Sequence, residues 1–233
     1  MNNDADILIQ FWRRLTEEWL PVYCNDAKRC YSVAGFKTDL KTVTSLDARD
    51  FIRAIDCGVV SDLGGGRYIM PRSGAKEVLF WEGKKGVTPR PITLWLESLI
   101  TMAAMARLHL DYGWPVECLG MQSKKPWEFD MVIFKTNDVK NEYIAGEVKP
   151  DSKKLDIFLA NLKECCAQGD HDCSLASKER INAHKKWKGL RRSHAPLFWA
   201  LGPGGDSRVF NVSYSTDGII TLEKTSDAQL HFS

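Results

Sequence analysis

The sequence predicts an α/β fold in which a mixed central β-sheet is flanked by helices, with a small, partly helical region in front of it. Two observations carry this prediction. Segments with helical periodicity alternate with short runs of β-forming residues, in the order helix, strands, helix, helix, strands over residues 91–222. The composition, with 44% hydrophobic and 27% charged residues, is that of an ordinary globular protein.

The 233 residues are enough for one or two domains with a sizeable core. We place a boundary at the polar connector that ends near residue 88. Residues 1–88 then form an N-terminal α+β region, and residues 89–233 form the core that carries the chemistry.

In the N-terminal region, apolar residues at helical spacing predict a helix over residues 4–20. Ser45 or Asp47 is expected to cap a second helix over residues 48–57. A hairpin is expected around the three glycines at 64–66. A helix followed by a glycine hairpin is typical of a winged helix, and equally of many small α+β units, so DNA contact by this region stays open.

In the core, an apolar helix is expected from residue 91 to residue 110, with Thr93 as its cap. A helix capped by Asp151 or Ser152 should end at Gly169, and a strongly basic helix should begin near Ser177. Strands are expected at residues 78–81, 129–134, 143–148, 197–201, 209–214 and 219–222.

Two of these strands carry charged residues at unusual places. Asp130 lies in the first apolar run, and Glu147 and Lys149 lie at the end of the second, which we expect to be its antiparallel neighbour. Side chains alternate along a strand, so Glu147 and Lys149 should point to the same face. Two carboxylates that converge in this way suit Mg²⁺. The alternative is a solvated hairpin with a salt bridge between Glu147 and Lys149.

This pattern resembles the PD-(D/E)XK, or restriction-endonuclease-like, nuclease superfamily. The matching residues are Asp130 on one strand, Glu147-Val148-Lys149 on the next, and Glu97 on the preceding helix, within residues 91–215. Phe129 stands where the superfamily often has proline. The resemblance implies a restriction-endonuclease-like core and catalytic roles for Glu97, Asp130, Glu147 and Lys149.

The resemblance also implies a cofactor and a reaction. Mg²⁺, with Mn²⁺ as a substitute, would be held by Asp130, Glu147 and the backbone carbonyl of Val148. Lys149 would orient the attacking water, and phosphodiester hydrolysis would leave 5′-phosphate and 3′-hydroxyl ends. For Glu97, an alternative is that it lies near the start of a helix only because an acid is favourable there.

Basic residues are concentrated in one segment. Residues 176–195 hold seven Lys or Arg and one Glu, a net charge of +6; since the whole chain carries +2, the rest sums to −4. A basic surface of this kind suits nucleic acid. The expected contacts, with Trp187 stacking on a base, are Lys124, Lys125, Lys153, Lys185, Lys186, Trp187, Arg191 and Arg192. The alternative is a helix with a buried Trp187 and solvated lysines.

We therefore expect a metal-dependent nuclease, most readily an endonuclease acting on DNA in restriction, repair or phage defence. One rival is a non-catalytic DNA-binding module with a structural acidic hairpin, and another is a hydrolase of a different phosphoester. A homodimer is expected if both strands of a duplex are cut. The start of the chain lacks a secretion signal and no apolar run reaches membrane-spanning length, so we expect a cytoplasmic protein with reduced cysteines and no membrane partner.

Overall fold

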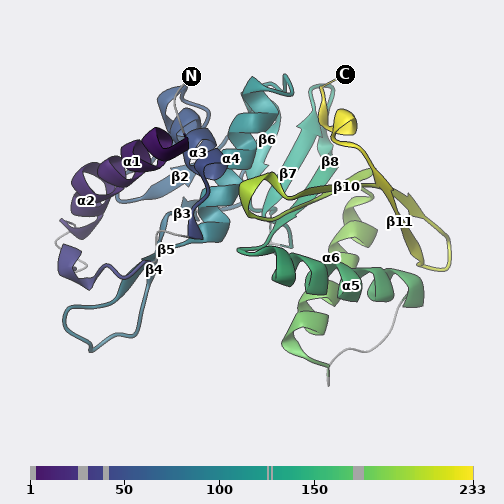
Figure 1. Ribbon diagram of the computed structural model, residues 1–233. Coiled ribbons are helices and arrows are strands. Elements are labelled where there is room, and N and C mark those ends of the chain that lie inside the picture. Colours follow the sequence, from purple (N-terminus) through teal and green to yellow (C-terminus); the bar gives the residue numbers. More distant parts are fainter. Residues whose placement is uncertain are drawn as a thin grey trace.

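The centre of the molecule is a six-stranded sheet in the order β11-β10-β9-β8-β7-β6 (Figure 1). The computed structural model describes residues 4–25, 31–38, 42–124, 126, 128–169 and 176–232. Strands β8 and β9 run parallel, and the other neighbouring pairs of this sheet are antiparallel. The strands are β6 (Leu119–Met121), β7 (Met131–Lys135), β8 (Asp138–Val148), β9 (Leu197–Leu201), β10 (Ser207–Tyr214) and β11 (Ile220–Thr225). The predicted α/β class with a mixed sheet is confirmed.

Helices cover both faces of this sheet (Figure 1). They are α4 (Leu96–Leu110) on one face, and α5 (Ser152–Gln168) and α6 (Lys178–Ser193) on the other. Successive residues of β7 alternate between the two sides. Met131 and Ile133 pack with α4, whereas Val132 and Phe134 pack with α5 and α6. Burial on both faces explains why this strand is apolar throughout.

The N-terminal part packs beside α4. Its helical segments are α1 (Asp4–Arg14), a π-helical turn (Leu15–Trp19), α2 (Leu20–Cys24) and α3 (Ser45–Asp56), and its strands are β1 (Ser61–Asp62), β2 (Arg67–Ile69), β3 (Glu77–Val78), β4 (Phe80–Glu82) and β5 (Ile92–Leu94). Strands β1 and β2 form the predicted hairpin. Phe11, Phe51 and Tyr68 share one hydrophobic cluster with α4 and the sheet. The division at residue 88 stays a prediction.

Two predicted helix starts are wrong. The helix expected from residue 91 begins at Leu96, because Ile92–Leu94 pair with β4 and Thr93 lies in that strand instead of capping a helix. The β-branched Ile92 and Thr93 favour this extended backbone. The helix expected from residue 48 begins at Ser45, and Thr44 caps it by accepting a hydrogen bond from the Asp47 N–H at 3.2 Å.

Other predictions for the core are confirmed. Asp151 caps α5, and Gly169 ends it with a positive φ of 67°. Ser177 caps α6, and Cys165 and Cys166 are buried on the inner side of α5. No helix in the described part of the chain is long and apolar enough to cross a membrane.

Candidate active site

Asp130 lies beside Glu147 because β7 and β8 pair as predicted. Asp130 directly precedes β7, and its N–H donates to the Gly146 carbonyl at 3.0 Å. Its side-chain Oδ2 accepts a hydrogen bond from the Val148 N–H at 2.9 Å. The Asp130 carboxyl is thereby held at the end of β8, next to Glu147.

Gly146 is what lets the two strands approach at this point. A Cβ atom built on Gly146 would lie 2.6 Å from Cε and 3.0 Å from Cβ of Met131, its partner in the strand pair. These distances are too short for ordinary contacts, so a larger residue would push β7 away from β8. The glycine directly before Glu147 thus fixes the spacing of the two carboxylates.

The Glu147 carboxylate is buried between two ammonium groups. Its Oε1 accepts a hydrogen bond from Lys149 Nζ at 2.5 Å, and its Oε2 lies 2.6 Å from Lys186 Nζ. Lys149 Nζ also donates to the Val148 carbonyl at 3.1 Å. Only 2% of Glu147 and 6% of Lys186 is exposed, so these charges interact with little screening by water. The first cation is the predicted one, and the second comes from α6.

The two carboxyls differ in pKa although they are neighbours. Burial, and then repulsion from Glu147, raises the pKa of Asp130 to about 7. Burial alone would also raise the pKa of Glu147, but the charges of Lys186 and Lys149 hold it below its usual range. Burial lowers the pKa of Lys149, but the carboxylates of Glu147 and Asp130 raise it by more, so that the pKa of Lys149 is raised overall. Near neutral pH the site therefore holds one ionised carboxylate beside a second that can gain or lose a proton.

The face of α6 that packs on the sheet includes Lys186 and Trp187, which were both expected at the surface. Ala183, Lys186, Trp187 and Leu190 lie at helical spacing on the buried face. Trp187 is 1% exposed and stacks on His184 with 5.1 Å between ring centroids. The expectation that Trp187 stacks on a base is wrong, because its ring belongs to the core. Lys186 is likewise not part of the surface expected to bind phosphate, because it pairs with Glu147.

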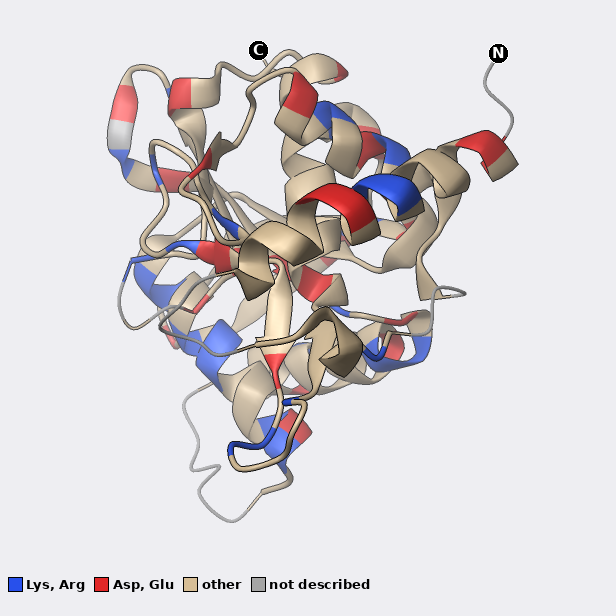
Figure 2. Ribbon diagram, turned by 90° about the vertical axis from the view of Figure 1, so that its left-hand side faces the viewer, with Lys and Arg blue, Asp and Glu red and all other residues tan. Residues whose placement is uncertain are grey.

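The other predicted nucleic-acid contacts lie mainly at the surface. Lys124, Lys153, Lys185, Arg191 and Arg192 are exposed, whereas Lys125 lies outside the described residues. Arg192 forms a two-pronged ion pair with Glu128, and the Arg191 guanidinium lies 5.5 Å from the Trp187 ring centroid. Figure 2 shows Lys and Arg gathered toward the lower part of the molecule, where α6 and the loop between β4 and β5 lie. Of these residues, Lys153 and Lys185 carry their charge most openly.

Glu97 lies in the first turn of α4 and forms a hydrogen bond with an aromatic residue. Its Oε2 accepts a hydrogen bond from Trp95 Nε1 at 3.2 Å. Its negative charge nevertheless acts on Lys149, as one of the weaker causes of the raised Lys149 pKa, after the larger effects of burial, Glu147 and Asp130. Glu97 thus lies at the edge of the site, and its predicted role in metal binding stays a prediction.

Glu77 is a further buried acid near the site, and it was not predicted from the sequence. Its carboxylate accepts hydrogen bonds from Ser98 Oγ at 2.5 Å and Gln122 Nε2 at 2.6 Å. Burial raises the pKa of Glu77. The Gln122 N–H donates to the Asp130 carbonyl at 2.8 Å, so this cluster supports the backbone that carries Asp130. Nothing in the polar stretch around Glu77 signals this contact.

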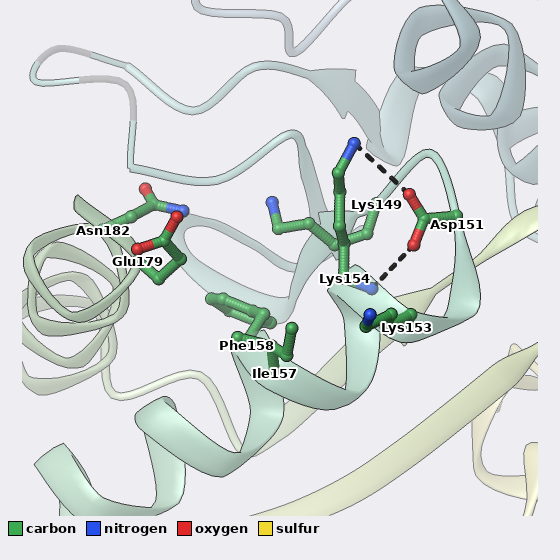
Figure 3. A pocket seen from close by; sticks show the side chains of 8 residues that line it. All are labelled: Lys149, Asp151, Lys153, Lys154, Ile157, Phe158, Glu179 and Asn182. Atoms are coloured by element: carbon green, nitrogen blue, oxygen red, sulfur yellow. Dashed lines mark hydrogen bonds and ion pairs between the residues drawn. The ribbon is translucent and has the colours of Figure 1, made fainter. Parts of the chain in front are cut away.

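A cavity opens beside Lys149, between α5 and α6 (Figure 3). It has a volume of about 430 Å³, and its lining includes Lys153, Phe158 and Asn182. Figure 3 shows the ammonium end of Lys149 extending over the Phe158 ring toward α6; its Nζ lies 5.0 Å from that ring centroid. Lys149 is thus part of the wall of this cavity as well as the partner of Glu147.

Asp130, Glu147 and the Val148 carbonyl are the oxygen donors that the sequence resemblance implies for Mg²⁺, and binding of the metal stays a prediction. Val148 lies between the two carboxyls, because its N–H donates to Asp130 and its carbonyl accepts a hydrogen bond from Lys149. Burial, followed by repulsion from Glu147, raises the pKa of Asp130. Within the described residues, no group of three or more His, Cys, Asp or Glu side chains is placed to hold a metal. Two carboxylates and water are the ligand set that Mg²⁺ commonly uses. Comparison with family models, curated proteins and solved structures gives no match.

Proposed function

We propose that this protein is a metal-dependent nuclease that hydrolyses phosphodiester bonds, with Asp130, Glu147 and Lys149 at its centre. The observation that carries the proposal is the meeting of two carboxylates and a buried lysine at the ends of two paired strands. One carboxyl has a pKa of about 7 and the other is held ionised. Such divergent pKa values are typical of functional sites.

The order of the elements supports a restriction-endonuclease-like core. Helix α4, with Glu97 in its first turn, precedes the strand that follows Asp130, and the strand that contains Glu147 and leads into Lys149 is followed by α5. These elements belong to a mixed sheet with helices on both faces. This is the arrangement that the sequence resemblance implies, and we propose it as the fold family.

In this proposal Asp130, Glu147 and the Val148 carbonyl bind Mg²⁺, which lowers the pKa of bound water and offsets charge on the phosphoryl oxygens. Lys149 orients the attacking water and stabilises the anionic transition state, because its ammonium is fixed by Glu147 and the Val148 carbonyl. Lys186 keeps Glu147 ionised, so that the carboxylate is ready for the cation.

The substrate is proposed to be DNA that follows the exposed basic residues. Lys153 lines the cavity beside Lys149, and Lys185 lies on the outer face of α6. These cations can neutralise phosphates on either side of the bond that is cut. The closely paired Arg192 contributes less, because Glu128 already offsets its charge.

One observation favours a second function, a non-catalytic DNA-binding module. Both oxygens of Glu147 already have a cationic partner, Lys149 for one and Lys186 for the other. A carboxylate paired in this way is satisfied without a metal. Under this alternative the hairpin is structural, DNA binding needs no divalent cation, and cleavage is absent.

The test is incubation with supercoiled, linear and single-stranded DNA, in Mg²⁺ and in EDTA. The proposal expects cleavage in Mg²⁺ only, and loss of at least about a hundredfold in rate for Asp130→Asn, Glu147→Gln and Lys149→Met, because each removes part of one assembly. Glu223→Gln, an exposed acid on β11, is the matched control and should cut normally. DNA binding without cleavage under every condition would favour the second function.

A further inference from the structure

The hairpin of β4 and β5 presents a large aromatic ring to solvent next to the candidate active site. Trp81 is 56% exposed, while its neighbour Phe80 is 2% exposed, as expected for alternating residues of a strand. An exposed indole keeps a large apolar surface in contact with water, and tryptophan is enriched at binding interfaces.

Trp81 is fixed in place by a second tryptophan. Its ring centroid lies 5.0 Å from that of Trp95, and the ring planes meet at 85°, an edge-to-face arrangement. Trp95 Nε1 in turn donates to Glu97 at 3.2 Å. Trp81 thus packs against Trp95 while 56% of it is exposed, and it is linked through Trp95 to an acid at the edge of the site.

This aromatic pair lines a hollow that also includes Glu97 and Pro150. The hollow has a volume of about 390 Å³ and is bounded by Trp81, Trp95, Glu97 and Pro150 among others. Pro150 directly follows Lys149, so the hollow and the candidate active site share one short stretch of backbone.

The loop that joins β4 to β5 adds positive charge to this edge. Lys84 and Lys85 are both exposed in this loop. An aromatic ring beside exposed lysines is the combination that single-stranded nucleic acid uses, because bases stack on rings and phosphates pair with cations. An acidic peptide would match the lysines but would not require the stacked indole.

We propose that Trp81 is a stacking platform for an unpaired base of the strand that is cut at Asp130 and Glu147. The inference rests on the proposed function and narrows its substrate to single-stranded nucleic acid or to strands with an unpaired end. Inside a duplex the faces of each base are covered by the neighbouring bases, so none is accessible to the Trp81 ring. Trp95 holds the platform, and Lys84 and Lys85 bind the neighbouring phosphates.

The test measures binding, so that its outcome is separate from cleavage. A fluorescently labelled twenty-nucleotide oligo-dT and a mixed-sequence duplex of equal length are titrated with the Asp130→Asn protein in EDTA, by fluorescence anisotropy. When Trp81→Leu is combined with Asp130→Asn in the same chain, oligo-dT binding should weaken by about 5- to 150-fold, the range for one base–aromatic stack. Duplex affinity should change less than twofold. Trp81→Phe should restore most of the loss, because a ring face returns.

Val87→Ala is the control, because Val87 is 46% exposed in the same hairpin loop and has no ring. Its affinity for oligo-dT should equal that of the parent protein. Unchanged oligo-dT affinity in Trp81→Leu, or an equal loss for oligo-dT and duplex, would overturn the proposal. If the wild-type protein binds oligo-dT through Trp81 but cuts nothing in Mg²⁺, the nuclease proposal fails while the stacking platform stands.

Discussion

Lys186 Nζ lies 2.6 Å from the Glu147 carboxylate, and both side chains are buried. The contact joins the middle of α6 to the end of β8, two elements far apart along the chain. Lys186 thus serves two purposes, since it balances a buried negative charge and it anchors the basic helix to the sheet.

Replacing Lys186 with Met should lower the free energy of unfolding by about 3 kcal/mol, because Glu147 then loses a buried partner. Lys185→Met, at the exposed neighbouring position, should change stability by no more than about 0.5 kcal/mol. Urea denaturation of both variants at pH 7.5 measures the difference. Equal stability of the two variants would show that the Lys186 pair contributes nothing net.

Asp130 should make the protein less stable as pH rises. Its pKa is about 7 in the folded protein and near 3.8 when unfolded, so between these values the folded state binds more protons. The contribution of Asp130 to the free energy of unfolding therefore falls from about pH 4 to about pH 7 and is constant above. Asp130→Asn removes this effect, so the variant should gain stability relative to the wild type at pH 8 but not at pH 4.5. Denaturation curves in EDTA at both pH values provide the measurement, and a difference that is independent of pH would contradict the assignment.

A divalent cation should stabilise the folded protein in the absence of DNA. At ten times its Kd, Mg²⁺ or Ca²⁺ contributes about 1.4 kcal/mol, which corresponds to a rise in Tm of about 3–6 °C for a chain of this size. The rise should be smaller at pH 5.5, because protons compete for Asp130. Calorimetry of the wild type, Asp130→Asn and the Glu223→Gln control tests this. A rise of the same size in Asp130→Asn would place the ion elsewhere.

The exposed cations near the site should set the salt dependence of DNA binding. Each phosphate contact in a duplex contributes about 0.9 to the slope of log K against log salt, or about 0.7 for a single strand. Lys153→Gln combined with Lys185→Gln should flatten the slope by up to about two units. Lys224→Gln, an exposed lysine on β11, is the matched control and should leave the slope unchanged. An unchanged slope in the double variant would mean that DNA follows another path.

Gly146→Ala should destabilise the protein by about 1–3 kcal/mol, because the added methyl group overlaps Met131. It should also impair divalent-cation stabilisation beyond this loss, since it separates Asp130 from Glu147. Combining it with Met131→Ala makes room for the methyl group, and stability should recover in part. No recovery in the double variant would show that the strain arises elsewhere.

The sequence pattern predicted the strands β7 and β8 that hold Asp130 and Glu147. It did not predict that Lys186 contacts Glu147. Strand pairing of β7 with β8 follows from two apolar runs joined by a short turn, so the meeting of Asp130 with the end of β8 could be expected. Lys186 could not be placed in advance, because the buried face of α6 is decided by how the helix docks on the sheet. Basic residues occur on every side of this helix in the sequence. The structure shows that Lys186 and Trp187 are buried whereas Lys185 is exposed.

The N-terminal boundary of α4 shows the same limit. Ile92 and Thr93 continue an apolar pattern into the helix, but the partner strand Phe80–Glu82 makes them extended. That pairing also brings Trp81 to Trp95 and both to Glu97, a relationship that separate segments of sequence do not reveal.

The parallel pairing of β8 with β9 has a consequence for how the site assembles. The hairpin of β7 and β8 can close within a short piece of chain, so Asp130 and Glu147 meet early. Strand β9 can join only after residues 149–196 have crossed over the sheet, and such long-range closure is slow. Lys186 lies in α6, which is part of that crossover. We therefore expect the β7–β8 hairpin to form before α6 docks on it, so that docking of α6 completes the charge balance of the site.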